Sequence, residues 1–286
     1  MKTKFVAGCL ILGLCICGCG PRQPRARHVI LLGFDTMSTR DIQRAGTPGL
    51  HHLIDNGAVS LHTRCVRDTV GSQNWISMVS GAPVEMHGVS SEECQTDAPG
   101  NVPPALSNAE GKFPTVFDQI RAQRPYLKQY AFIEWADETS LYDMDAFDLS
   151  YVYGIDSTLK EPVDVMKKAF DTYLQDRPEV LFLSMDLTDP QCDALIDDFV
   201  QTLEARDWMK NTVILVTAGH GGDPMAKFEI PVILYGKGVT KGKVMKRTNL
   251  IYDVGATVAG LLGVKLPGEC RGKFLSEAFQ SADLTR

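Results

Sequence analysis

Val29-Ile-Leu-Leu-Gly-Phe-Asp35 is a continuous apolar run that stops at a carboxylate, and this stretch decides the fold. Such a run is typical of a strand that is buried on both faces of a parallel sheet. Similar runs occur at residues 180–185, 213–216 and 230–235, and residues 129–135 are a further strand candidate. The sequence therefore predicts a mostly parallel sheet.

Helical patterns alternate with these runs. Apolar residues at helical spacing, with Pro, Asn and Gly at the ends, predict helices over 47–56, 74–80, 113–121, 162–174, 192–206 and 250–262. Alternation of this kind is typical of an α/β fold with a doubly wound sheet and helices on both faces, which is a three-layer sandwich. We expect one domain over 29–286, with an excursion at 90–112.

The composition is that of an ordinary globular protein. The chain has 286 residues, of which 44% are hydrophobic and 22% charged. These values argue against disorder, a coiled coil and a multispan membrane protein. The formal net charge of −6 argues against a nucleic-acid partner, because an acidic surface repels polyanions.

The N-terminus has the pattern of an export signal. Lys2 and Lys4 precede an apolar run that is too short to span a bilayer stably. The ending Ile16-Cys-Gly-Cys19 resembles a bacterial lipobox, in which the final Cys is lipidated. We expect a signal peptide over 1–18, a lipid on Cys19 and a tether over 19–28. The domain would then lie in the periplasm or outside the cell, anchored to an envelope membrane. An ordinary cleaved signal is the alternative.

Four further cysteines, at positions 65, 94, 192 and 270, follow the predicted signal. An exported protein meets an oxidising compartment, so one or two disulfides are compatible with the sequence. Wide spacing and the absence of a CxxC motif give no support to a zinc site made of cysteines. Spacing alone does not fix the pairing.

Polar residues follow three of the predicted strands. These are Asp35, the pair Asp186 and Asp189, and His220. Ligands of open parallel sheets bind beyond the carboxyl ends of the strands, and carboxylates and imidazoles are zinc ligands. Each residue taken singly can instead be a helix cap or a loop residue.

Residues 68–75 precede a short predicted helix and carry two hydroxyl groups, on Thr69 and Ser72. A hydroxyl at a helix N-terminus can act as a nucleophile that is assisted by the helix dipole. A plain N-cap is the alternative.

Several motifs together resemble the alkaline-phosphatase superfamily. The resemblance is to its type I phosphodiesterase/nucleotide pyrophosphatase branch, which is sulfatase-like and includes lipoproteins, and it covers nearly all of the chain after the tether. It rests on Val29–Asp35, Thr47-Pro-Gly-Leu50, Asn74-Trp75, Ser80-Gly-Ala-Pro83, His87-Gly88, His220-Gly-Gly222, Glu229-Ile-Pro231, Tyr235-Gly-Lys-Gly238, Tyr252-Asp-Val254 and Arg271-Gly-Lys273.

This resemblance implies a mechanism. Members hold two metal ions, usually zinc, with three Asp and three His. A Ser or Thr between the metals attacks a phosphate ester, and activated water then hydrolyses the phospho-enzyme. One ion lowers the nucleophile's pKa and the other offsets charge on the leaving oxygen.

The family's catalytic residues are only partly present. Asp35 matches the first metal-binding Asp, and Asn74 matches the Asn that contacts the phosphoryl group. The nucleophile's position is Gly71, which has no side chain. Ser72 and Thr69 are near but out of register.

The remaining metal ligands are also incomplete. Asp189 matches the Asp of an Asp-x-x-x-His motif, but Asp193 stands at the position of its His. His220 matches either the His of Asp-His-Gly, with Gly219 in place of Asp, or a later family His. Asp223 is a conceivable substitute carboxylate. At most Asp35, Asp189 and His220 remain, enough for a single zinc or other divalent ion, or for helix caps without any metal.

Three interpretations follow from the sequence. The first is a catalytically impaired homologue that binds a phosphorylated small molecule, a glycan or a protein partner. The second is an active metal-dependent phosphoric ester hydrolase with a rearranged site built on Ser72 or Thr69. The third is a structural or complex-forming lipoprotein whose pocket has no role.

Overall fold

The computed structural model describes residues 26–44, 46–66, 71–90, 98–187, 189 and 191–280. Its strands are β1 (His28–Thr36), β2 (Ala58–Arg64), β3 (Gln129–Ile133), β4 (Leu149–Val152), β5 (Val180–Met185), β6 (Thr212–His220), β7 (Glu229–Gly236) and β8 (Lys243–Val244). Its α-helices are α1 (Thr39–Arg44), α2 (Pro48–Asn56), α3 (Ser72–Ser80), α4 (Val84–His87), α5 (Val116–Gln123), α6 (Val163–Asp176), α7 (Gln191–Ala205) and α8 (Asp253–Leu262). The 3₁₀ turns are η1 (Ala136–Leu141), η2 (Met144–Ala146), η3 (Trp208–Lys210) and η4 (Ser276–Ala278).

All eight strands join one sheet in the order β4-β3-β5-β1-β6-β7-β2-β8. The strands from β4 to β6 run parallel, whereas β7 is antiparallel to both of its neighbours. The prediction of a mostly parallel α/β sheet is confirmed. Every residue of β5 and the first seven of β1 are buried, as the apolar runs indicate.

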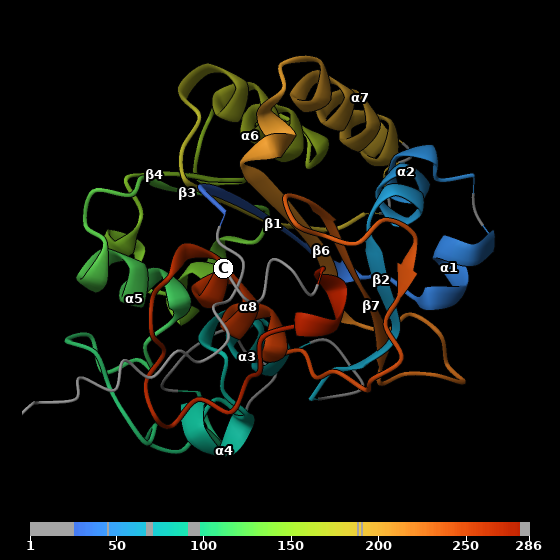
Figure 1. Ribbon diagram of the computed structural model, residues 1–286. Helices are drawn as coiled ribbons and strands as arrows, with labels where there is room; N and C mark the ends of the chain where they lie inside the picture. The colour runs from blue at the N-terminus through green and yellow to red at the C-terminus, as the bar shows by residue number, and fades with distance from the viewer. Residues whose placement is uncertain are drawn as a thin grey trace, which may run out of the picture.

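Helices cover both faces of the sheet (Figure 1). On one face α6 packs against β3 and β5, and α7 contacts both α6 and α2. On the other face α3 packs against β6, α8 against β1, and α5 against α8. The central strands therefore lie between two helical layers, and the carboxyl ends of β1, β3, β5 and β6 form one edge of the sheet.

The amino end of β1 differs from expectation. His28, predicted to belong to the tether, is the first residue of the strand and is only 2% exposed. Its Nδ1 lies 2.8 Å from the carbonyl oxygen of Pro178, and burial lowers the pKa of its imidazole. The sequence alone predicts a tether at His28, because nothing in it indicates a hydrogen-bond partner 150 residues away.

Helix α5 begins at Val116, later than the predicted start at Phe113. A capping box fixes this start: the Asp118 amide donates to Thr115 Oγ1, and the Thr115 amide donates to the Asp118 carboxylate. Helix α8 likewise begins at Asp253 instead of 250. Strands β4 and β8 were not predicted, and they are short edge strands of four and two residues.

Within the part of the chain that the structure describes, no helix combines the length and the apolar character that crossing a bilayer requires. Cys192 and Cys270 form no disulfide there, and burial raises the pKa of both thiols, to about 12 and about 11. Cys19 and Cys94 lie outside the described residues.

Candidate functional site

Asp35 and His220 lie together at the carboxyl edge of the sheet. The parallel register of β1 and β6 pairs Thr36 with His220, and Nε2 of His220 lies 3.5 Å from Oδ2 of Asp35. The Thr36 hydroxyl is 3.0 Å from the same Nε2 and donates to Asp35 at 3.4 Å. Interaction with Asp35 raises the pKa of His220, and burial acts in the opposite direction. Such a pair can hold a proton or one cation.

The indole of Trp75 packs over the main chain of the strands that carry this pair. Trp75 is 3% exposed and lies over Gly33 of β1 and Gly219 of β6. A Cβ atom on Gly33 would lie 2.6 Å from Cζ3 of the indole. One on Gly219 would lie 3.4 Å from its Nε1 and 3.2 Å from the Asp35 carbonyl oxygen. A side chain at position 219 would therefore contact Trp75 and lie slightly too close to the Asp35 main chain, and Gly219 itself offers no carboxylate in place of the family's second Asp.

The position of the family nucleophile is also filled. Gly71 is the N-cap of α3, and a Cβ atom added to it would overlap Oε1 of Gln73. Gln73 is 2% exposed, and its Nε2 donates to the Ser90 carbonyl oxygen at 2.7 Å. Its Oε1 accepts no hydrogen bond from any described residue. Ser72 is 1% exposed, and Thr69 lies outside the described residues.

Asn74, which matches the family's phosphoryl-binding Asn, is fully buried in α3. Its Oδ1 accepts from the Val66 amide at 2.9 Å and so fixes the end of the segment that follows β2. A contact to the main chain accounts for this oxygen without any ligand.

Asp189 lies at the start of α7, where its Oδ1 accepts from the Gln191 amide at 2.8 Å. It also lines an open cleft of about 540 Å³ beyond β3 and β5, together with Glu134, Asp186, Glu161 and Lys167. The cleft places Asp189 beside other carboxylates. Among the described residues, no hydrogen bond or ion pair joins Asp189 to Asp35 or His220.

The two substitute carboxylates have other partners. Asp193 accepts from the amides of Gly49 and Leu50, at 2.8 and 2.9 Å, and so satisfies the N-terminus of α2. Asp223 forms an ion pair with Arg40 at 2.7 Å and accepts from the Met225 amide. Both side chains have local structural roles.

Sequence reasoning missed two carboxylates near Asp35. Glu134 follows β3, and its Oε2 accepts from the Asp186 amide at 2.7 Å. Burial raises the pKa of Glu134, and the charges of Asp186 and Asp35 raise it further. Glu138 lies in η1, is 1% exposed and accepts from the hydroxyls of Ser184 and Tyr142. A Glu in a helical turn gives no sign in sequence that it is buried.

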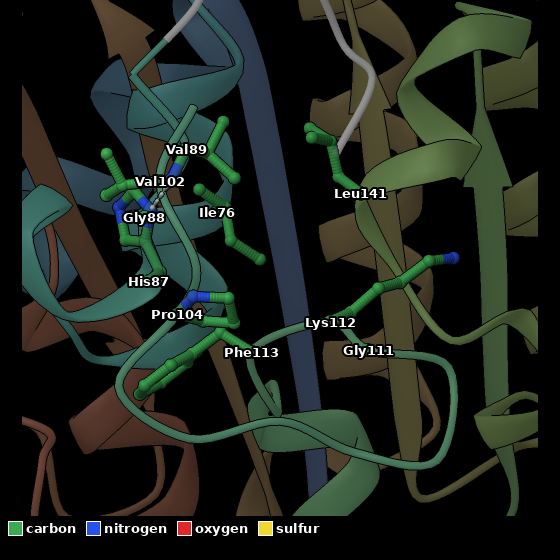
Figure 2. A pocket seen from close by; sticks show the side chains of 10 residues that line it. All are labelled: Ile76, His87, Gly88, Val89, Val102, Pro104, Gly111, Lys112, Phe113 and Leu141. Carbon is green, nitrogen blue, oxygen red and sulfur yellow. Dashed lines mark hydrogen bonds between the residues drawn. The ribbon is translucent and has the colours of Figure 1, made fainter. Parts of the chain in front are cut away.

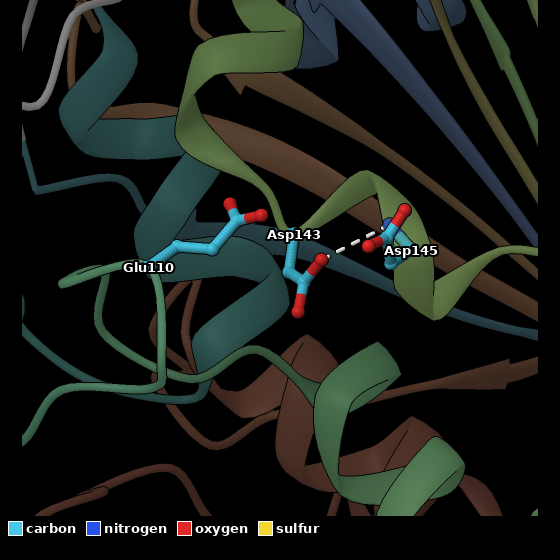
Figure 3. Close-up of side chains that lie close together, drawn as sticks. All are labelled: Glu110, Asp143 and Asp145. Atoms are coloured by element: carbon cyan, nitrogen blue, oxygen red, sulfur yellow. Dashed lines mark hydrogen bonds between the residues drawn. The ribbon is translucent and has the colours of Figure 1, made fainter.

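The donors at the carboxyl edge do not fit a pair of zinc ions. Among the described residues, the one group of three donor side chains with ligand atoms within 4.8 Å of one another is Glu110, Asp143 and Asp145. Figure 3 shows Glu110 on one segment of the chain and Asp143 and Asp145 on another, at η2. Glu110 also pairs with Lys112 at 3.0 Å, which reduces the charge available to a cation.

His87, predicted to be a capping or packing residue, is 2% exposed. The Val89 amide donates to its Nδ1, and its Nε2 lies 2.8 Å from the Ser77 hydroxyl. Burial lowers its pKa to about 3, so the ring is neutral. It borders a cavity of about 30 Å³, closed by residues such as Ile76 and Phe113 (Figure 2), which has room for water only.

Solved structures share this fold at low sequence identity. A murine ectonucleotide pyrophosphatase/phosphodiesterase 5 is 12% identical with a TM-score of 0.66, and the match covers 88% of this chain and 100% of that chain. A variant of the alkaline phosphatase PafA is 11% identical with a TM-score of 0.66, covering 90% and 99%. The lipoteichoic acid synthase LtaP from Listeria monocytogenes is 13% identical with a TM-score of 0.63, covering 92% and 76%.

Curated relatives match over a short segment only. A phosphopentomutase from Clostridioides difficile is 38% identical over 64 residues, which is 20% of this chain and 16% of the relative. A second, from Methylobacterium, is 42% identical over 59 residues, or 14% of its length. The chain thus matches about a sixth or less of the length of these enzymes.

The family model gives the most extensive match in sequence. The model of type I phosphodiesterase/nucleotide pyrophosphatase matches residues 29–235, which run from β1 into β7 and include Asp35, Asn74, Asp189 and His220. The chain belongs to the type I phosphodiesterase/nucleotide pyrophosphatase family.

Proposed function

We propose that this chain is an envelope lipoprotein whose phosphodiesterase-like domain binds a ligand and does not hydrolyse phosphate esters. The observation that carries the proposal is the nucleophile position. Gly71 offers no hydroxyl, and the amide oxygen of Gln73 occupies the space into which a side chain at 71 would extend. Ser72, the nearest alternative among the described residues, is only 1% exposed and stands one residue out of register with the family nucleophile.

The arrangement around Asp35 supports the same proposal. Family chemistry needs two ions, one at the nucleophile and one at the leaving oxygen. Trp75 packs against Gly219, which offers no carboxylate, while Asp193 and Asp223 are engaged with α2 and Arg40. A chain with this set of contacts lacks both the nucleophile and the means to activate it.

The open cleft beside Asp189 is the place for a ligand. Its volume of about 540 Å³ lies within the range of small-molecule sites, and it lies beyond the carboxyl ends of β3 and β5. Four carboxylate side chains and one ammonium group line the cleft: Glu134, Glu161, Asp186, Asp189 and Lys167. These charges favour a ligand with a cationic group over one with a bare phosphate.

Phosphodiester hydrolysis tests the catalytic part of the proposal. The full chain, supplied with Zn²⁺, is incubated with bis(p-nitrophenyl) phosphate beside its Asp35→Ala and Ser72→Ala variants. We expect the same background rate from all three proteins. We expect no gain from Gly71→Ser either, because the new hydroxyl would still lack the pair of metal ions that activates the family nucleophile. A rate that exceeds background and falls in Ser72→Ala would support the rearranged hydrolase instead.

Mass spectrometry tests the lipid anchor separately. The mature chain isolated from bacterial membranes is expected to begin at Cys19 and to carry the mass of acyl chains. The Cys19→Ala variant should remain an unprocessed precursor. A mature chain that begins elsewhere without lipid would contradict the anchor and leave the proposal on catalysis unaffected.

A further inference from the structure

The described chain begins at the edge of the sheet that is opposite Asp35. The Ala26 amide donates to the Leu261 carbonyl oxygen at 3.0 Å, and the Arg27 amide donates to that of Asn211 at 2.9 Å. These contacts fix the chain beside the starts of the parallel strands β1 and β6. The amino edge of the sheet is therefore where any tether from the N-terminus reaches the domain.

A group of cationic and aromatic side chains lies at this edge. The guanidinium carbon of Arg177 is 4.2 Å from the centroid of the Trp208 ring, and that of Arg206 is 4.9 Å from it. Arg177 precedes β5 and Trp208 precedes β6, while Arg27 precedes β1, which lies between these two strands. We call Arg27, Arg177, Arg206 and Trp208 the amino-edge patch.

Main-chain geometry positions the residues of the patch. Arg177, at φ 51°, and Asp207, at φ 62°, are the non-glycine residues with positive φ in the described chain. Asp tolerates this region, and Arg177 adopts it as the C-cap of α6, where its amide donates to the Tyr173 carbonyl oxygen. Arg206 also donates to the Leu174 carbonyl oxygen, and Thr212 donates to that of Trp208. The indole and both guanidinium groups are thus set in place before any partner arrives.

Basic residues outnumber acidic ones around the patch, although the whole chain has a net charge of −6. Three lysines lie nearby: Lys128 precedes β3, Lys210 belongs to η3 and Lys237 follows β7. Three acidic residues lie nearby, and of these only Asp207 forms an ion pair among the described residues. Asp176 accepts from the Tyr130 hydroxyl, Glu179 from the Lys128 amide, and Asp207 pairs with Lys210.

We propose that the amino-edge patch rests on an anionic membrane surface. The proposal rests on the lipid anchor proposed above. Seven residue steps separate Cys19 from Ala26, so the tether spans at most about 25 Å whatever its conformation. Its Arg22 and Arg25 add charge next to the predicted lipid. Arginine and tryptophan side chains suit the headgroup region, and basic clusters beside an anchor are attracted to anionic lipids.

This orientation has a consequence for the other edge. Strand β1 runs for nine residues from His28, next to the patch, to Thr36, next to Asp35. That length is about 30 Å. The docked domain therefore presents the Asp35 pair and the acidic cleft away from the membrane, toward ligands in solution.

Quenching of tryptophan fluorescence tests the proposal. The full lipidated chain is reconstituted into phosphatidylcholine vesicles, with and without phosphatidylglycerol, that carry nitroxide-labelled headgroups. The Trp208→Phe variant identifies the signal of Trp208. We expect Trp208 to be quenched in the anionic vesicles, with less quenching in neutral vesicles and at high salt.

Charge-reversal variants provide the matched comparison. Arg177→Glu/Arg206→Glu should shift the docked-to-undocked ratio by about tenfold or more, because each basic residue contributes near the surface. If the double variant fails to fold, Arg206→Glu alone, which changes an exposed side chain, replaces it as the test. The single variant should give a smaller shift in the same direction. Lys160→Glu/Lys227→Glu makes the same change of charge near the opposite edge and should have no effect.

Equal loss in both double variants, or equal quenching in neutral and anionic vesicles, would overturn the proposal. Absence of lipid on Cys19, seen by mass, would be a failure of the anchor alone. The same unlipidated chain would then be sedimented with the two kinds of vesicle, and failure to bind the anionic ones preferentially would overturn the patch as well. Preferential binding to an anionic protein or nucleic acid over vesicles would also contradict it.

Discussion

Glu138 is a carboxylate that the fold buries completely, and at this residue burial has a measurable cost. Burial raises its pKa to about 7, even though Ser184 and Tyr142 donate hydrogen bonds to it. Below the ordinary pKa of 4.5 both the folded and unfolded states are protonated. Between pH 4.5 and about 7 only the unfolded state ionises, so the free energy of unfolding falls as pH rises.

The isosteric variant Glu138→Gln removes this titration. We expect the variant to gain up to about 3 kcal/mol relative to the wild type when pH is raised from 5 to 8. Denaturant unfolding of both proteins at the two pH values measures this difference, and the contribution of all other groups cancels. An unchanged difference would mean that Glu138 is ionised in the folded protein at pH 5.

Side chains explain why the site could be predicted only in part. The meeting of Asp35 and His220 follows from strand ends that share one edge, which sequence can indicate. The packing of Trp75 against Gly33 and Gly219, and of Gln73 against Gly71, depends on side-chain rotamers. No motif encodes such packing, and the roles of Asp35, Asp189, His220 and Asn74 toward a metal or phosphate stay predictions.

The packing of α2 on α7 depends on one carboxylate that sequence reasoning placed near a metal site. Asp193, in the first turn of α7, is 9% exposed and accepts from two amides at the start of α2. Gly49 permits this approach, because a Cβ atom there would overlap the Asp193 carbonyl oxygen. The carboxylate acts as an N-cap supplied from another helix.

Asp193→Ala should therefore lower the free energy of unfolding by about 2 kcal/mol, because it leaves amides of a helix N-terminus without their acceptor. Asp198→Ala, an exposed site on the same helix, is the control and should change it by no more than about 0.5 kcal/mol. Urea unfolding compares the two variants. Equal effects would remove Asp193 from this role.

Elements with strong patterns were predictable, and weak edge elements were not. Strands β1, β5 and β6 have continuous apolar sequence because both faces are covered by helices. Strand β4 is a four-residue edge strand with partly exposed residues, so its pattern is too short to be seen. The predicted start of α5 at Phe113 is three residues early, because Pro114 favours a helix start in sequence whereas Thr115 is the N-cap in the structure.

At the scale of the whole molecule, the sheet separates two surfaces. Its carboxyl edge carries Asp35, His220 and the acidic cleft, and its amino edge carries Trp208 with its two arginines. The family fold is retained between them, while Gly71 and Gly219 stand where the resemblance places a nucleophile and a metal-binding Asp. We propose that the family's two-metal site has been dismantled.

Zinc stoichiometry tests this claim most directly. The full chain is incubated with excess Zn²⁺, desalted and analysed for metal beside Asp35→Ala, with Asp143→Ala as the control for the separate Glu110, Asp143 and Asp145 group. We predict no more than one zinc ion per chain that depends on Asp35. Two zinc ions per chain, lost in Asp35→Ala and kept in Asp143→Ala, would contradict the account.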